Sequence, residues 1–359
     1  MKFKVTLLPG DGIGTEVIDA AAVVLSAVER KYGHDFGLNK MPIGGSAIDL
    51  TGVPLPDETR KECLSSDAVL LGAVGGGKWD SLQSHMRPER GILSLRTEMK
   101  LFASLCPVVL HSYSKIKTGA IKPELTVNGV DIMLVRELSG GMYFGDHGYR
   151  DGALGQEAFD SEVYSINEIE RVTKIAFELA ATRRKHVTSV DRADLLTTGK
   201  LWKATVERVG KNYDGIKLDR MLVNHCAYKL IAAPTEFDVI VTSNIFGAIL
   251  SSELAALCGS TGMIPSGEIG VGKAGLYEPI HGSAQDIAGK DLANPIGAIL
   301  SAAMMLSMSL ELETEAMAVD KAVRKALEKG LRTHDIAGGK KYVSCSRMAE
   351  EISMNILNG

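Results

Sequence analysis

The stretch from Gly275 to Asn294 contains the residues whose types and spacing most clearly suggest binding chemistry. It reads Gly-Leu-Tyr-Glu-Pro-Ile-His-Gly-Ser-Ala-Gln-Asp-Ile-Ala-Gly-Lys-Asp-Leu-Ala-Asn, which is rich in small residues and has no helical or strand period. Small residues let a backbone approach a ligand closely. His281 offers a flat ring, and the carboxylate of Asp286 can accept two hydrogen bonds from a ribose diol. The pattern predicts a loop that holds adenosine, and a plain Gly/Ser surface loop is the alternative.

A buried helix is expected to anchor this loop. Pro295 opens the apolar run from Ile296 to Leu312, which predicts a helix of the core. The run contains three serines and is shorter than the roughly 20 apolar residues that a bilayer span requires. We therefore expect no membrane span here.

The loop resembles the dinucleotide loop of the isocitrate/isopropylmalate family of β-decarboxylating dehydrogenases, whose pattern is G-L-Y-E-P-x-H-G-S-A-P-D-I-A-G-K-x-x-A-N-P. Only Gln285 departs from this pattern within the stretch. Asp286-Ile287 is similar to the pair in the NAD-using members, and an acid there would also repel the 2′-phosphate of NADP. The resemblance implies NAD as the cofactor and the following cofactor-binding residues: Gly75, Gly76, Glu278, His281, Gly282, Ser283, Ala284, Asp286 and Asn294.

The same resemblance implies a set of substrate-binding residues. A 2-hydroxy acid with a second carboxylate needs cationic donors in a fork geometry, which arginine supplies. Arg96 and Arg136 match two of the family's three substrate arginines, whereas Cys106 stands at the third position. Ile92 matches a position that contacts the substrate side chain in isopropylmalate dehydrogenases. Without the resemblance, the arginines are typical of a solvated surface, and Ile92 and Cys106 are typical of a core.

Proton transfer is assigned by the resemblance to Tyr143 and to the position of Arg192. Tyr143 matches the acid that protonates the enol, and Arg192 stands where the family has a lysine that helps to accept the hydroxyl proton. Arginine keeps the positive charge, but a pKa above about 12 makes it a poor proton acceptor. Asp194 replaces an asparagine that lies near the nicotinamide in the family. The alternative for Tyr143 is a loop tyrosine that packs against the sheet.

The family binds Mg²⁺ or Mn²⁺ through three aspartates, and all three are replaced in this chain. Their positions are Asn224, Ala248 and Ser252. Hard cations require anionic oxygen ligands. Ala248 and Ser252 lie four residues apart on one helix face, yet neither can take the place of a carboxylate. The sequence therefore predicts that the metal expected from the family is not held by these residues.

Alternating strand and helix patterns predict an α/β fold, with a sheet that carries helices on both faces. The turn from Pro9 to Gly14 lacks the G-x-G-x-x-G spacing, so a classical Rossmann fold is not expected. Ser165 and Glu168 form a capping box that predicts the start of a helix. Strands are expected at residues 4–8, 67–74, 130–135, 186–190 and 237–242, and further helices at 200–209, 245–257, 316–329 and 346–357.

The resemblance covers nearly the whole chain and implies two lobes. One is a discontinuous cofactor-binding lobe of residues 1–101 plus 260–359, and the other is a substrate and dimerisation lobe of residues 102–259. The family also implies a homodimer whose subunits complete each other's sites.

The numbers of charged residues and cysteines limit the binding partners and the cellular compartment that we expect for this protein. The chain has 40 basic and 44 acidic residues and a net charge of −4, which gives no electrostatic basis for binding nucleic acid or an anionic membrane. Five scattered cysteines predict free thiols in a reducing cytoplasm, and the first residues show no signal-peptide pattern. We expect a cytoplasmic protein with a small-molecule substrate.

Three functions stay open at this point. The first is an NAD-dependent dehydrogenase of the 3-isopropylmalate type with weak or no metal-dependent oxidative decarboxylation. The second is an NAD enzyme for a different, less carboxylated substrate that acts without a divalent metal. The third is a non-catalytic NAD-binding homologue, such as a regulatory partner of an active subunit.

Overall fold

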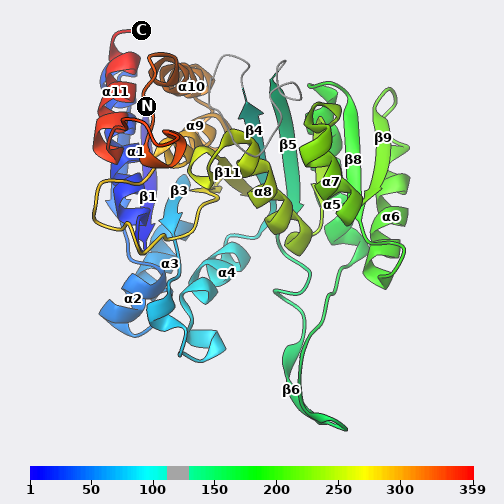
Figure 1. The fold of residues 1–359 in the computed structure, drawn as a ribbon. Coiled ribbons are helices and arrows are strands. Elements are labelled where there is room, and N and C mark those ends of the chain that lie inside the picture. The colour runs from blue at the N-terminus through cyan, green and yellow to red at the C-terminus, as the bar shows by residue number, and fades with distance from the viewer. Residues whose placement is uncertain (111–128) are drawn as a thin grey trace. The chain divides into compact units, whose positions relative to one another are not determined.

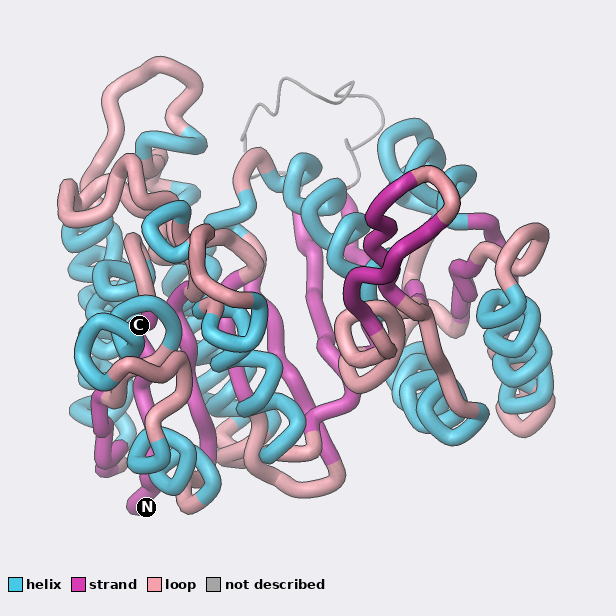
Figure 2. Tube along the Cα trace, turned by 90° about the horizontal axis from the view of Figure 1, so that it is seen from below, coloured by secondary structure: helices cyan, strands magenta, loops and turns pink. Residues whose placement is uncertain are grey.

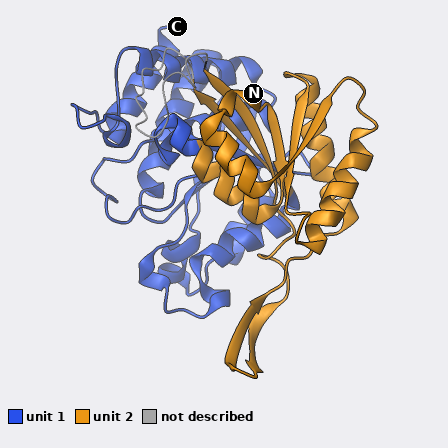
Figure 3. Ribbon diagram, turned by 45° about the vertical axis from the view of Figure 1, so that its right-hand side comes forward, with its two compact units in different colours: residues 1–101, 113–120, 255–359 blue, residues 102–112, 121–254 orange. Residues whose placement is uncertain are grey.

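The computed structural model describes residues 1–110 and 129–359 (Figure 1). They form two compact units: unit 1 comprises residues 1–101 and 255–359, and unit 2 lies within residues 102–254 (Figure 3). Both ends of the chain belong to unit 1, so its core combines segments that are far apart in the sequence. Within the described ranges, no helix has both the length and the apolar character that a membrane crossing needs.

The sheet of unit 1 has the strand order β2, β1, β3, β12, β11. The bounds are β1 Lys2–Gly10, β2 Asp35–Lys40, β3 Ala68–Ala73, β11 Pro265–Gly270 and β12 Leu276–Pro279. Neighbours from β2 to β12 run parallel, and β11 runs antiparallel to β12. The expectation of a continuous loop from Gly275 was therefore wrong for β12, because Leu276 and Tyr277 are buried and pair with β3.

Alternate residues of these strands enter two separate apolar cores, one on each face of the sheet. Leu7, Leu70 and Tyr277 share a core with helices α1 (Gly14–Tyr32), α9 (Ile296–Met308), α10 (Glu313–Glu328) and α11 (Cys345–Leu357). Leu8, Leu71 and Leu276 share the other core with α3 (Asp57–Leu64) and α4 (Pro88–Glu98), and α2 (Gly44–Thr51) contacts α4. Helices therefore cover both faces of this sheet, as the sequence predicts.

The apolar run after Pro295 is helical only as far as Met308, so the expected helix to Leu312 was too long. Ser309 turns the chain, because its hydroxyl donates a hydrogen bond to the carbonyl oxygen of Lys273 at 2.7 Å. Leu310 and Leu312 stay buried after the turn. The apolar pattern therefore predicted correctly that these residues are buried, but the helix that it predicted was too long.

The sheet of unit 2 has the order β4, β5, β10, β8, β9. Its strands are β4 Leu101–Leu110, β5 Val130–Glu137, β8 His186–Asp191, β9 Lys217–Leu222 and β10 Val239–Thr242. β4 runs antiparallel to β5, and the other neighbours run parallel. The helices are α5 Ile166–Ala181, α6 Thr197–Gly210, α7 Val223–Ala232 and α8 Asn244–Cys258. The capping box predicted at Ser165 and Glu168 opens α5 and is confirmed.

A hairpin of β6 (His147–Gly152) and β7 (Gly155–Asp160) extends away from the rest of unit 2 (Figure 3), and its two strands lie side by side (Figure 2). Its side chains are mostly exposed, including Tyr149 and Leu154. An isolated two-stranded hairpin is at best marginally stable in water. The sequence analysis did not predict this element, because its residues show no apolar face.

Candidate active site

Asp11, in the turn after β1, joins three backbone segments of unit 1. Its buried carboxylate accepts hydrogen bonds from the backbone N–H groups of Gly75 (2.8 Å), Gly45 (2.9 Å) and Ser46 (2.7 Å). Burial raises the pKa of this carboxyl group, and the three N–H donors oppose that shift. Gly75 and Gly76 have φ angles of 109° and 153°, which favour glycine. Asp11 therefore fixes the predicted cofactor-binding glycines.

The loop that follows β12 packs on the same turn. The backbone N–H of Ile13 donates to the carbonyl oxygen of Ser283 at 2.8 Å. A Cβ on Gly12 would lie 1.9 Å from that oxygen, so only glycine fits. Gln285, the one departure from the family pattern, donates from Nε2 to the carbonyl oxygen of Gly75 at 3.1 Å. The loop and the glycine segment after β3 are thus directly connected.

His281, Gly282 and Asp286 leave polar atoms and space for a ligand. The Nε2 atom of His281 is shut off from solvent and has no hydrogen-bond partner among the described residues, while its Nδ1 atom lies 2.9 Å from the carbonyl oxygen of Gly282. Burial lowers the pKa of His281. Asp286 is exposed. A Cβ on Gly282 would meet no atom of the described chain within 4 Å.

Glu278 and Asn294, two further predicted cofactor residues, make contacts inside unit 1. The buried Asn294 donates from Nδ2 to Asp335 Oδ2 at 3.0 Å, and its Oδ1 atom accepts from the N–H of Ile296 at the start of α9. Glu278 accepts from Arg96 Nη2 at 2.8 Å. These side chains therefore hold the two ends of the loop.

Arg96, a predicted substrate arginine, lies on α4 and is paired with two glutamates. Its Nε and Nη2 atoms donate to the two carboxylate oxygens of Glu268 at 2.8 and 2.5 Å. The side chains of Arg96 and Glu268 are only 12% and 2% exposed. Burial opposes the charge, yet Glu268 and Glu278 raise the pKa of Arg96. The guanidinium is therefore charged and internally paired.

Arg136, the other predicted substrate arginine, lies on β5 and is positioned by α8. Its Nε and Nη2 atoms donate to Asn244 Oδ1 at 3.1 and 2.7 Å. Asn244 in turn donates from Nδ2 to the carbonyl oxygen of Gly140 and from its backbone N–H to the hydroxyl of Tyr164. A Cβ on Gly247 would lie 2.5 Å from Arg136 Cγ. The hydrogen bonds to Asn244 hold the guanidinium of Arg136, and glycine at position 247 leaves the room that the arginine side chain needs.

Tyr143, Ile92 and Cys106 lie in different surroundings. Tyr143 is 38% exposed in the segment between β5 and β6. Ile92 belongs to the core beneath α4, beside Leu95 and Leu276, as the alternative interpretation anticipates. Cys106 is buried on β4, and all five cysteines of the chain are buried and unbridged. Of the three residues, only Tyr143 presents its side chain at the surface of its unit.

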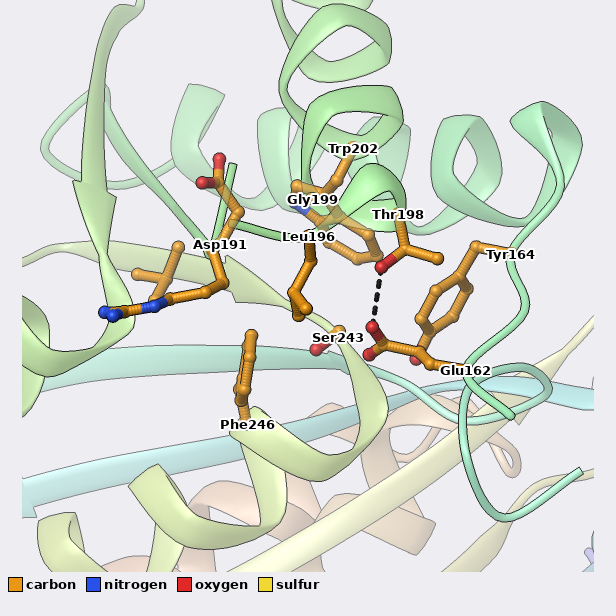
Figure 4. A pocket seen from close by; sticks show the side chains of 11 residues that line it. Glu162, Tyr164, Asp191, Leu196, Thr198, Gly199, Trp202, Ser243 and Phe246 are labelled. Atoms are coloured by element: carbon orange, nitrogen blue, oxygen red, sulfur yellow. Dashed lines mark hydrogen bonds between the residues drawn. The ribbon is translucent and has the colours of Figure 1, made fainter. Parts of the chain in front are cut away.

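Arg192 follows β8 and lines a small pocket of unit 2 (Figure 4). Its Nη1 atom donates to Asn224 Oδ1 at 2.7 Å, and its Nε atom lies 3.4 Å from Asp194 Oδ1. Asp191 and Ser243 also line this pocket. Burial raises the pKa of Asp191, and the hydroxyl of Ser243 is buried without a hydrogen-bond partner in the described chain.

The sequence profile of the isocitrate/isopropylmalate dehydrogenase family matches residues 4–352 of this chain. The chain belongs to this family. The 3-isopropylmalate dehydrogenase of Geobacillus kaustophilus is 51% identical over 358 residues, which cover 99% of this chain and 96% of that protein. The chloroplastic 3-isopropylmalate dehydrogenase 2 of Arabidopsis thaliana is 46% identical over 99% of this chain and 88% of its own length. The solved isocitrate dehydrogenase from Methylococcus capsulatus has a TM-score of 0.87 at 30% identity and covers 99% of both chains. The predicted family and α/β fold are confirmed.

The dehydrogenase family implies a nicotinamide dinucleotide and a divalent metal, and the residues present fit only the first. Within residues 1–110 and 129–359, the buried Nε2 atom of His281 has no hydrogen-bond partner and Gly282 has no neighbour where its Cβ would lie, which, with the exposed Asp286, fits a dinucleotide. At the family's metal positions, Asn224 and Ser252 offer neutral oxygens and Ala248 offers none, and the hydroxyl of Ser252 donates to the carbonyl oxygen of Ala248. This donor set does not fit Mg²⁺ or Mn²⁺.

Three residues of this family member were missed by sequence reasoning: Asp11, Asn244 and Glu268. Asp11 was visible only as one acid in a glycine turn, and Asn244 only as a polar residue after a buried strand. Glu268 lies in a strand whose neighbours are buried, and a buried charge requires a partner. A charged residue in an otherwise buried strand could therefore have been recognised from the sequence as a paired residue, but its partner could not have been identified.

Proposed function

We propose that this chain is an NAD-dependent, 3-isopropylmalate dehydrogenase-like oxidoreductase that acts on a 2-hydroxy acid, with weak or no metal-dependent oxidative decarboxylation. Family membership supports the reaction class. The main support for the cofactor is the loop after β12, where, among the described residues, His281 Nε2 has no hydrogen-bond partner and a Cβ added at Gly282 would meet no atom. Asp286 disfavours a 2′-phosphate by charge, which supports NAD over NADP.

Each unit supplies a different part of this chemistry. When bound, NAD accepts a hydride from the carbon that carries the substrate hydroxyl. In unit 1, Asp11 and Gln285 hold the glycine segment and the loop that bind the cofactor. In unit 2, Asn244 positions the guanidinium of Arg136, and the phenol of Tyr143 is accessible for proton transfer. Arg192 keeps a positive charge near Asn224 but is a poor proton acceptor.

Two measurements test this proposal. Calorimetric titration with NADH should give a binding isotherm, and titration with Mn²⁺ should give none at Asn224, Ala248 and Ser252. An NADH-production assay on isopropylmalate, malate and tartrate, with and without Mn²⁺, then reports the substrate and the metal dependence. A protein that does not bind NADH, or whose turnover rises steeply with Mn²⁺, would contradict the proposal.

The second candidate is an NAD-binding homologue without turnover, such as a regulatory partner of an active subunit. It is favoured by the joint replacement of a proton-accepting lysine by Arg192 and of the metal aspartates by neutral residues. General acid–base catalysis is worth about 10²–10⁴-fold in rate, so both losses together reduce activity strongly. NADH binding with no NADH production from any 2-hydroxy acid would favour this candidate.

We also propose a cytoplasmic homodimer. The exposed hairpin of β6 and β7 supports a second subunit, because a lone hairpin needs another surface to pack against. The five unbridged cysteines are consistent with a reducing compartment. Sedimentation equilibrium on the full chain tests the dimer, and a monomer at micromolar concentration would contradict it.

A further inference from the structure

Two carboxylates and one thiol come together in unit 1, and none of the three is a predicted site residue. Glu16 lies in the first turn of α1, Cys345 is the first residue of α11, and Asp291 belongs to the segment between β12 and α9. One oxygen of each carboxylate and the Sγ atom of Cys345 all lie within 4.8 Å of one another. α1 and α11 pack side by side (Figure 1), so the fold of unit 1 itself assembles this cluster.

The carboxylate of Glu16 is the member of the cluster that lacks a partner. Both of its oxygens are shut off from solvent, and neither has a hydrogen-bond partner among the described residues. Because one of them lies within 4.8 Å of both other ligand atoms, the carboxylate is directed into the cluster. A buried, unpartnered carboxylate is strongly unfavourable unless a cation or a proton neutralises it. The dipole of α1 compensates for this only in part.

Asp291 is held in place by hydrogen bonds that leave it able to bind a cation. Its Oδ1 atom accepts from the backbone N–H of Ser346 at 2.8 Å, and its Oδ2 atom accepts from the hydroxyl of Ser346 at 2.6 Å. Its carbonyl oxygen accepts from the N–H of Cys345 at 3.0 Å. Each carboxylate oxygen can accept more than one bond. Ser346 therefore orients Asp291 as a residue behind a metal ligand does.

A pocket opens at this cluster, and its walls are acidic. Among the described residues that line it, none is a lysine, arginine or histidine, and four are acidic: Glu16, Asp19, Asp291 and Glu350. Asp19 and Glu350 pair with Lys40 and Arg347, which do not line the pocket. Burial raises the pKa of the Cys345 thiol, and the nearby carboxylates add to this effect. A bound cation offsets it, because a metal replaces the proton of a thiol.

We propose that Glu16, Asp291 and Cys345 bind one Zn²⁺ ion, which links α1, α11 and the segment after β12. A thiolate ligand favours Zn²⁺ over Mg²⁺ or Mn²⁺. Zn–S and Zn–O bonds of about 2.3 and 2.0–2.2 Å place two ligands of one ion at most about 4.5 Å apart, which is close to the spacing of the cluster. On binding, the thiol releases its proton to solvent and the sulfur bonds the metal as thiolate, and water takes the fourth position. The site uses none of the family's metal positions and does not rest on the proposed function.

Titration of the full chain with Zn²⁺ tests the proposal, after a chelator has removed bound metal and with the thiols kept reduced. Wild type should bind one Zn²⁺ per chain with a Kd on the order of 10⁻⁶ M or tighter, which is weaker than zinc sites with four protein ligands. Zn²⁺ should also raise the Tm, because it binds the folded state. Co²⁺ in its place should give a thiolate charge-transfer band in the near ultraviolet. Wild-type protein that binds no Zn²⁺, or that binds Co²⁺ without this band, overturns the proposal, and neither result requires a variant to fold.

Cys345→Ser and Glu16→Gln each remove one ligand and nearly keep its size. Each should weaken Zn²⁺ binding by about 100-fold or more, because even the loss of a residue that supports a ligand costs 10–100-fold. Cys63→Ser and Glu315→Gln are the matched controls, since both residues are buried in unit 1 and lie outside the cluster, and they should keep the wild-type affinity. Zn²⁺ binding of wild-type strength by folded C345S or E16Q protein overturns the proposal, as does an equal loss in the controls.

Discussion

The side-chain oxygen of Asn224 accepts a hydrogen bond from Arg192 Nη1 at 2.7 Å. Arg192 follows β8, and Asn224 lies in the first turn of α7. The family resemblance implies a proton-accepting lysine and a metal-binding aspartate at these two positions. Here a guanidinium donates to a neutral amide, so the pair makes a polar contact, and under the proposed function neither residue takes the role that the resemblance implies.

Restoring the carboxylates should restore metal binding. The variant N224D/A248D/S252D places three anionic oxygens at the family's metal positions, two of them on one face of α8. We expect it to bind Mn²⁺ with a Kd on the order of 10⁻³ M or tighter, in the range that carboxylate count sets. Titration calorimetry measures this, and the N224D/A248N/S252N variant, which carries one of these carboxylates in place of three, should bind more weakly. Equal Mn²⁺ binding by wild type and N224D/A248D/S252D would show that these residues are not the metal site.

Gly247→Ala should displace Arg136. The new Cβ would lie 2.5 Å from Arg136 Cγ, so the arginine must move from Asn244. We expect a loss of about 1–3 kcal/mol in stability, as for other overpacked sites, and a weaker affinity for a 2-hydroxy acid. Urea unfolding and substrate titration measure the two effects. Gly272→Ala is the control, because its Cβ meets no described atom within 4 Å; an equal effect of both changes would contradict the prediction.

Asp11→Asn should loosen the segment at Gly75. The amide of asparagine has only one acceptor oxygen, so at least one of the N–H groups of Gly45, Ser46 and Gly75 loses its partner. Each unpaired N–H group costs about 1–3 kcal/mol, so the urea midpoint should fall and NADH binding should weaken. The exposed Asp80→Asn change should shift stability by less than about 0.5 kcal/mol. Unaltered NADH binding in a destabilised D11N protein would assign Asp11 a purely structural role.

His281 should make stability depend on pH. Burial lowers its pKa from the ordinary value of 6.5, so the unfolded chain binds its proton at a higher pH than the folded chain. The stability that this neutral ring contributes is present above pH 6.5 and is lost as the pH falls from 6.5 through the lower pKa of the folded state. We expect the Tm to drop on acidification from pH 7 to pH 5, and less so in His281→Gln.

The exposed His85→Gln change provides the comparison for this pH experiment. It should keep the wild-type dependence of Tm on pH, since the replacement is at the surface and leaves His281 unchanged. Identical pH profiles for wild type and H281Q would exclude His281 as the source.

The strands β1, β3, β5, β8 and β10 were predicted from the sequence, whereas β2, β4, β9, β11, β12 and the hairpin were not. β10 is a short apolar run, β8 is a short run that contains two valines and a threonine, and a helix follows each of them, which is the pattern of strands in an α/β fold. β2 and β9 lie at the edges of their sheets, and their mixed polar composition shows no buried face. β12 has only four residues, which is too short for a period to be visible.

The site could be predicted in part, because the loop after β12 is continuous in the sequence. The contacts that determine the surroundings of Arg96 and Arg136 join residues that are far apart in the sequence. Arg96 and Glu268 are separated by 172 positions, and Arg136 and Asn244 by 108. The residue types at Arg96 and Arg136 suggested anion binding, but only the folded structure shows that one of them is already satisfied internally.

Because β12 pairs with β3, the sheet of unit 1 can be completed only late in the synthesis of the chain. Unit 1 begins with the first strands to leave the ribosome, but their core is closed by β12, α9 and α11, which are made last. Unit 2 lies between these segments and has all of its strands in one stretch of chain. Non-local pairing is slow because the intervening chain must first be closed into a loop. The N-terminal strands therefore have an unfinished apolar face while unit 2 is made, and the loop after β12 is expected to form among the last parts of the protein.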